Sequence, residues 1–202
     1  MASDRRGAVR TLLNIALFQI GWFASVLGAA HHRPYLGPLV VGTALAIHLR
    51  FFGTKLEALL ILASALLGTV AESSLALAGL LAYRADPGPA WACPPWIVAM
   101  WANFGLTLRH SLRGLDGRPL LATAVGAVAG PLAYVAGSRL GALTLLEPVS
   151  GVLLLSVLWG GALYALLRIQ LSIKILRYFL DKTHGVFYTL GVETQQPKPK
   201  ET

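Results

Sequence analysis

Long apolar runs alternate with short polar or glycine- and proline-containing segments along most of the chain. An apolar run of about 18 residues or more is typical of a helix that crosses a lipid bilayer. The pattern predicts a polytopic, all-α membrane helix bundle over residues 1–168. Its six expected transmembrane helices cover residues 11–30, 35–51, 57–83, 96–112, 120–138 and 149–167.

The third apolar run, residues 57–83, is too long for a straight crossing. As one helix it would measure roughly 40 Å, whereas the hydrocarbon core of a bilayer is about 30 Å thick. We expect a break or bend near Glu72, Ser73 and Ser74, with a second apolar piece at the outer surface. A single tilted helix is the alternative.

The segment that follows the sixth run has a different character. Residues 169–190 interleave apolar side chains with lysine and arginine. This pattern fits an interfacial helix on anionic lipid and equally a cytoplasmic extension of the sixth helix. We treat residues 169–202 as a separate basic, amphipathic tail, and expect disorder at residues 195–202.

Charge indicates an orientation. The chain is 55% hydrophobic and 13% charged, yet its formal net charge is +8, a value that in a soluble protein would suggest nucleic-acid binding. With six spans and a cytoplasmic N-terminus, 14 lysines and arginines fall on the inner side and three on the outer side. The positive-inside rule therefore predicts that both termini are cytoplasmic, and the dispersed cations argue against a nucleic-acid partner. The outer three are Arg33, Arg84 and Arg139.

Polar side chains inside the apolar runs need partners, because an unpaired polar group in a membrane is costly. We expect Gln19 to meet Asn103 at one depth, and Asn14 to face His48 or His110 near the inner surface. Such groups either hold helices together or form a site. The polar intramembrane candidates are Asn14, Gln19, His48, Asn103, Thr107, His110 and Tyr134.

Glu72 is the acidic residue that lies well inside an apolar run. Glu72 and His110 are the candidate catalytic acids or bases, and Arg109 and Arg113 the candidate ligands of a phosphate headgroup. No HExxH, GxSxG, phosphate-loop or dinucleotide-binding pattern occurs. The lone Cys93 has no metal-ligand spacing, so we expect no metal site and no cofactor.

Close helix packing is indicated by Gly126 and Gly130, which form a GxxxG pattern in the fifth run. This face could contact another helix of the chain or another membrane subunit. The tail, residues 169–202, is the second candidate surface for a protein partner.

Three segments resemble one bacterial inner-membrane family, catalogued as domain of unknown function 2878. They are NIALFQIGWFASVLGAA (residues 14–30), PPWIVAMWANFGLTLRHSLRGL (residues 94–115) and GPLAYVAGSRLGAL (residues 130–143). The resemblance extends over residues 11–167. Glu72 and Ser73 match the acidic-serine pair of the family, in which aspartate is the usual acid. The resemblance implies a six-helix protein of the inner membrane and carries no established activity.

Three functions remain open from the sequence. The first is an accessory bundle that binds a partner or a small molecule. The second is a lipid-modifying enzyme that uses Glu72 or His110 as its acid or base. The third is a small transporter with Glu72 in a water-filled cavity.

Overall fold

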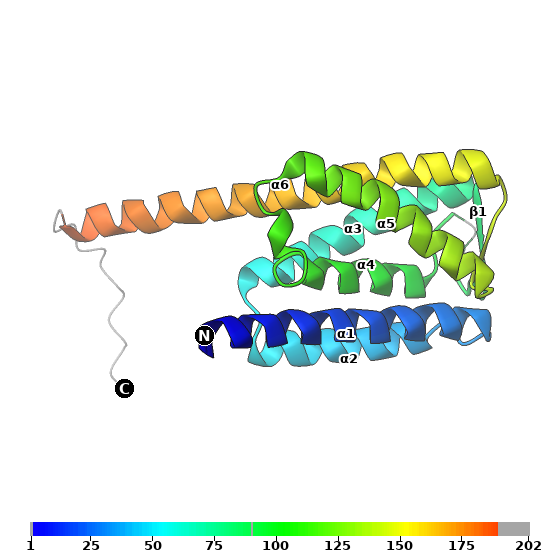
Figure 1. Cartoon of the computed structure of the whole chain (residues 1–202), viewed down its shortest axis with the longest axis horizontal. Helices are drawn as coiled ribbons and strands as arrows, with labels where there is room; N and C mark the ends of the chain where they lie inside the picture. Colours follow the sequence, from blue (N-terminus) through cyan, green and yellow to red (C-terminus); the bar gives the residue numbers. More distant parts are fainter. Residues whose placement is uncertain (1, 90, 190–202) are drawn as a thin grey trace, which may run out of the picture.

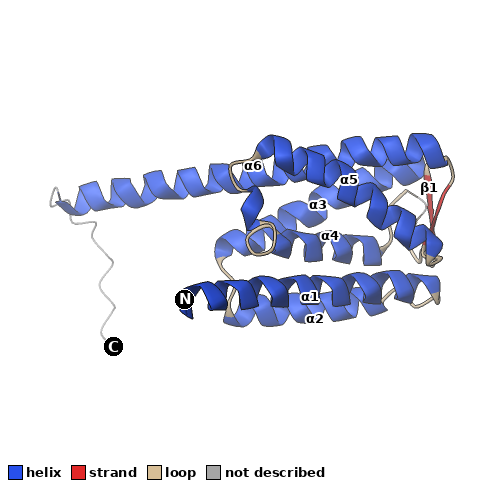
Figure 2. Cartoon of the chain, in the orientation of Figure 1, coloured by secondary structure: helices blue, strands red, loops and turns tan. Residues whose placement is uncertain are grey.

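The computed structural model describes residues 2–89 and 91–189, with side chains placed at residues 7–89, 91–176, 178 and 179. Within these residues the chain forms six α-helices, one 3-10 turn and two short strands (Figures 1 and 2). The helices are α1 (Ala2–Ala30), α2 (Leu36–Phe51), α3 (Lys55–Leu77), α4 (Pro95–Thr107), α5 (Pro119–Arg139) and α6 (Pro148–Thr189). The strands are β1 (Leu81–Tyr83) and β2 (Leu143–Leu145).

The helices lie side by side and run alternately in opposite directions (Figure 1). The start of α1, the α2–α3 and α4–α5 connections and the extension of α6 lie at one end, which we call the basic end. The other three connections and both strands lie at the opposite end, which we call the strand end. Helix α4 packs against α1, α2 and α3, while α5 packs along α6.

The strands link two connections at the strand end. β1 follows α3 and β2 follows α5, and they pair antiparallel with Tyr83 opposite Leu143. The backbone N–H of Leu146 also donates to the carbonyl of Leu80, at 3.1 Å. Because the two connections are far apart in sequence, this pairing ties the α3–α4 half of the bundle to the α5–α6 half.

Helix α3 differs from the expectation at its C-terminal part. The expected break near Glu72, Ser73 and Ser74 is wrong, because the helix continues through these residues to Leu77. The apolar residues that follow form β1. The excess length of the third run is therefore absorbed by a turn and a strand at the strand end.

Helix α6 continues past residue 168 to Thr189 as one α-helix, and Figure 1 shows this extension projecting beyond the basic end. Residues 169–190 were expected to form either an interfacial helix or an extension of the sixth helix. As far as Thr189, they form the extension. Its first turns are fastened to the α4–α5 connection, because Gln170 Nε2 and Lys174 Nζ both donate to the carboxylate of Asp116, at 2.6 and 2.8 Å. The expectation for residues 195–202 lies outside the described residues.

The expectation of six full transmembrane helices is only partly met. In the described chain, four segments are long and apolar enough to cross a membrane, and they are Gly7–Ala30, Lys55–Leu77, Pro119–Arg139 and Pro148–Leu176. Helix α2 is apolar but shorter, with 16 residues. Helix α4 has 13 residues and is only about 20 Å long. The chain is a multi-pass membrane protein by the length and composition of its helices.

Aromatic rings and glycines fill the contacts that α6 makes with α4 and α5. The rings of Trp101 on α4 and Trp159 on α6 stack with centroids 4.3 Å apart. A Cβ on Gly126 would overlap the backbone of Trp159, and a Cβ on Gly130 would overlap its side chain. The GxxxG face is therefore covered by α6 of the same chain, and the expectation that it could serve another subunit is wrong.

Candidate functional site

Glu72 lies near the strand end of α3 and is fully buried. Its Oε1 accepts a hydrogen bond from the hydroxyl of Tyr134 on α5 and one from Trp101 Nε1 on α4, at 3.1 Å. Its Oε2 accepts one from the hydroxyl of Tyr83 on β1, at 2.6 Å. One carboxylate thus joins four elements of the bundle.

This arrangement explains how an acidic residue is tolerated at that position. A buried carboxylate is costly unless hydrogen bonds satisfy its oxygens, and here both oxygens have donors. With no exposed surface, Glu72 does not line a water-filled cavity, which the transporter interpretation required. The sequence pointed to Glu72 and Tyr134, but not to Tyr83 or Trp101 as its partners.

The polar groups of α1 have different partners from those expected. Asn14 is buried, and its Oδ1 accepts a hydrogen bond from Ser111 Oγ at 2.8 Å rather than from either histidine. Asn103 Nδ2 donates to the carbonyl of Phe18 at 3.0 Å, whereas the side chain of Gln19 is exposed. The expected contact between the side chains of Gln19 and Asn103 is therefore wrong, because Asn103 bonds to the backbone of the preceding residue, Phe18. These bonds have the form expected of interhelical contacts.

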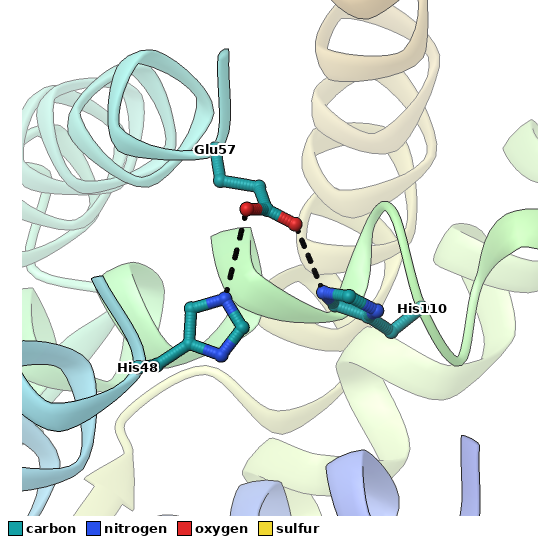
Figure 3. A group of neighbouring side chains, drawn as sticks. All are labelled: His48, Glu57 and His110. Atoms are coloured by element: carbon teal, nitrogen blue, oxygen red, sulfur yellow. Dashed lines mark ion pairs between the residues drawn. The ribbon is translucent and has the colours of Figure 1, made fainter. Parts of the chain in front are cut away.

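A second polar cluster forms at the basic end from His48, Glu57 and His110 (Figure 3). His48 is in the last turn of α2, Glu57 in the first turn of α3, and His110 in the turns after α4. His110 Nε2 lies 3.0 Å from Glu57 Oε1, and His48 Nε2 lies 3.7 Å from Glu57 Oε2. The donor atoms of all three side chains lie within 4.8 Å of one another.

Glu57 is held by a capping box at the start of α3. The backbone N–H of Glu57 donates to Thr54 Oγ1 at 3.3 Å, and the backbone N–H of Thr54 donates to Glu57 Oε2 at 2.8 Å. A capping box satisfies two backbone donors at a helix start and fixes the direction of the glutamate. The sequence interpretation missed Glu57, although its Thr-x-x-Glu pattern at residues 54–57 is the signature of such a cap.

His110 is positioned by the turns that end α4. Thr107 is buried and donates through Oγ1 to the carbonyl of Phe104, while the backbone N–H of His110 donates to the carbonyl of Thr107 at 3.1 Å. Burial lowers the pKa of His110, and nearby His48 and Arg109 lower it further, against the opposing effect of Glu57. The neutral imidazole, which has a free nitrogen lone pair, is therefore favoured at neutral pH.

Of the two predicted headgroup ligands, only Arg109 reaches this cluster. Its Nη1 donates to Thr54 Oγ1 at 2.8 Å and lies 3.6 Å from Glu57 Oε1. Arg113 begins the 3-10 turn (Arg113–Leu115) and is exposed.

The His48 and His110 Nε2 atoms are both buried and lack a hydrogen bond within the described part of the chain. Both nitrogens face the Glu57 carboxylate and pair with it electrostatically when protonated. Buried polar atoms normally have partners, so this cluster has unused binding capacity. Two imidazole nitrogens and a carboxylate can ligate a metal ion or act as an acid–base pair.

Comparison with known proteins adds a family but no activity. Neither the curated proteins nor the solved structures contain a match to this chain. The model of one family, described as "Protein of unknown function (DUF2878)", matches residues 11–165, from α1 into α6. This match includes His48, Glu57, Glu72 and His110, and it confirms the resemblance seen in the three sequence segments. The chain belongs to the DUF2878 family of proteins of unknown function.

Proposed function

We propose that this protein is a ligand-binding helix bundle of the membrane, and that its binding residues are His48, Glu57 and His110. The observation that carries the proposal is the pair of buried histidine nitrogens without hydrogen bonds beside one buried carboxylate. An unsatisfied polar cluster lowers stability, and such clusters persist where a bound ligand provides the missing partners.

The contrast with Glu72 supports this choice of site. Glu72 is inaccessible, and both of its oxygens already accept hydrogen bonds. The side chains of His48 and His110 are 17% and 29% exposed, so this cluster lies at the surface of the bundle, with its Nε2 atoms buried just beneath. We therefore assign Glu72 to the structure of the bundle and the basic-end cluster to binding.

The proposal includes a location, with the protein in a bacterial inner membrane and both termini and the basic end in the cytoplasm. Supporting it, the alternating helices collect cations at the basic end. Cytoplasmic loops of membrane proteins carry such an excess. The described cations there are Arg10, Arg50, Lys55, Arg109, Arg113, Arg118, Arg168 and Lys174.

A lipid-modifying enzyme is the second candidate, and the geometry of His110 favours it. Its imidazole is partly exposed and lies 3.0 Å from a carboxylate that could orient it as a general base. Arg109 stands beside the pair and could hold a phosphate headgroup. In this version the bound ligand is a substrate that turns over.

Native mass spectrometry of the protein, released from membranes in mild detergent, tests binding. We expect a bound species on the wild-type chain that is absent from the His48→Ala/His110→Ala variant. The matched control is His31→Ala/His32→Ala, which removes two exposed histidines at the strand end and should keep the bound species. Wild-type protein that carries no adduct dependent on His48 and His110 would contradict the proposal.

A lipid profile of a deletion strain separates the enzyme from the binding protein. If the protein is an enzyme, the profile changes and the wild-type gene restores it, whereas the His110→Gln variant does not. An unchanged profile, together with a histidine-dependent adduct, favours binding without catalysis.

A further inference from the structure

We infer that His48, Glu57 and His110 form a site for a divalent transition-metal ion with two histidine ligands and one glutamate ligand. The inference rests on the proposed function, since it names the ligand of the same cluster. It also revises the expectation from sequence that the chain has no metal site. The ligands are 9 and 53 residues apart in sequence, so no short metal-binding motif could reveal them.

The distances between the donor atoms suit such an ion. Two ligand atoms about 2.0–2.1 Å from a tetrahedral metal ion are about 3.3 Å apart. His110 Nε2 lies 3.0 Å from Glu57 Oε1 and His48 Nε2 lies 3.7 Å from the other oxygen, Oε2, so both distances are near that value. All three donor atoms fall within 4.8 Å of one another, close enough for the side chains to share one ion.

The backbone around the ligands is held in place before binding. Thr54 fixes Glu57 through the capping box, and Asn14 on α1 fixes the His110 turn through two hydrogen bonds from Ser111. Preorganised ligands lose less conformational freedom when the ion binds. The ring centroids of the two histidines are already only 5.5 Å apart, and the rings are nearly perpendicular.

The donor types select the class of metal. Imidazole nitrogen suits Zn²⁺, Co²⁺, Ni²⁺ and Cu²⁺, whereas Mg²⁺ and Ca²⁺ prefer sets of oxygen ligands. Three protein ligands leave at least one coordination position for water or a further molecule, as in catalytic rather than structural zinc sites.

Substitution of Arg109 distinguishes a metal site from a purely structural cluster, because only a metal site should bind the ion more tightly when this positive charge is removed. Its charge lies 3.6 Å from Glu57 Oε1 and opposes a cation at the cluster. At a separation of about 6 Å, removing one positive charge favours a divalent cation by about ten-fold even in water. Arg109→Gln, which removes the charge but keeps a polar side chain, should therefore bind the metal about ten-fold more tightly.

The experiment uses the full chain, purified in detergent with a tag that lacks histidine and stripped of metal with a chelator. Co²⁺ is titrated first, because its visible absorption reports a low-coordinate site with nitrogen and oxygen ligands, and Zn²⁺ is then used to displace it. We expect one ion per chain, bound by the wild type and by His31→Ala/His32→Ala. We expect binding at least about 100-fold weaker in His48→Ala, in His110→Ala and in Glu57→Gln.

Glu57→Gln keeps the fold testable, because glutamine can also complete a capping box. Wild-type protein that binds no Co²⁺ or Zn²⁺, or that binds them equally well without His48 and His110, overturns the metal inference. If an organic adduct that depends on both histidines is nevertheless seen in the mass spectrum, the proposed function stands and only the metal is wrong. Loss of both signals refutes both.

Discussion

The carboxylate of Glu72 shows how one residue can organise a membrane bundle. Its partners come from β1, α4 and α5, so its hydrogen bonds connect both halves of the protein. Hydrogen bonds to a buried acceptor contribute most when their loss leaves several donors unpaired. This role is energetic, and it predicts an effect on stability.

Glu72→Ala should lower the free energy of unfolding by about 3–5 kcal/mol, because it leaves three donors without an acceptor, two of them fully buried. Tyr134→Phe and Tyr83→Phe each remove one donor and should cost about 1–3 kcal/mol. Ser74→Ala is the matched control, since Ser74 is exposed and bonds only to the preceding turn of its own helix. Unfolding in mixed detergent measures all four variants, and a Glu72→Ala variant as stable as Ser74→Ala would refute the structural role.

Cys93 precedes α4 and is 7% exposed. Burial raises the pKa of its thiol to about 11, and only the thiolate reacts with alkylating agents. At about pH 8 the folded protein should react with iodoacetamide on the order of a hundred-fold more slowly than a free cysteine. The rate should rise about ten-fold per pH unit up to about pH 10, and denatured protein should react at the ordinary rate.

A folded protein that is alkylated as fast as the denatured one would show that Cys93 is open to solvent. Mass spectrometry of the intact chain gives both rates. Loss of the pH dependence would instead indicate that access, and not ionisation, limits the reaction.

At the scale of helices and strands, hydropathy predicted where the helices lie but not how far each extends. The run at residues 96–112 is apolar enough on average to predict a span, yet α4 ends at Thr107. The end is set by the Thr107 hydroxyl and by the tight turns through His110. Hydropathy cannot report such local hydrogen bonds, and for the same reason it could not predict the strand pair after α3.

The sequence predicted two of the three residues of the candidate site, His48 and His110, but not Glu57. His48 and His110 stood out as polar residues at apolar run ends, and the expected orientation placed both at the inner side. Glu57 lies at that same level, but an acid in the first turn of a helix is common as a cap, so its type and position alone did not point to a site. Depth in the membrane brings residues to one level, whereas rotation about each helix axis decides which of them touch. Gln19 and Asn103 were expected to meet because they share a depth, but rotation about the α1 axis leaves the side chain of Gln19 exposed.

The α5–α6 contact predicts opposite effects for two glycines. Gly130→Ala should lower the free energy of unfolding by about 1–3 kcal/mol, because its Cβ would overlap the Trp159 side chain in a packed interface. Gly161→Ala on α6 should instead raise it by up to about 1 kcal/mol, since nothing lies near its Cβ and alanine favours the helix. Detergent unfolding compares them, and a harmless Gly130→Ala would show that α5 and α6 do not pack this closely.

At the scale of the whole molecule, two polar clusters occupy opposite ends of one bundle. The strand end holds a fully satisfied carboxylate and two paired strands, which make it the more constrained end. The basic end holds partly exposed histidines with unused nitrogen atoms. Buried polar atoms therefore lack hydrogen-bond partners at the basic end and have them at the strand end. This contrast is expected when the first end binds a ligand and the second maintains the fold.

The orientation of this division is a prediction for intact cells. On a Cys93→Ala background, Gly88→Cys places a thiol in the α3–α4 connection at the strand end, and Gly114→Cys places one in the α4–α5 connection at the basic end. Both positions are exposed. With the chain in a bacterial inner membrane, a membrane-impermeant maleimide should label Gly88→Cys in intact spheroplasts and Gly114→Cys only after lysis.

The physical reason is the distribution of cations, which resist transfer across the membrane and keep the basic end inside. Labelling of Gly114→Cys alone would reverse the orientation and place the histidine cluster outside the cell. Labelling of both before lysis would mean that α4, at about 20 Å, does not separate the two connections. The short helix would then form a re-entrant segment, and His110 would be approached from the same side as the strand end.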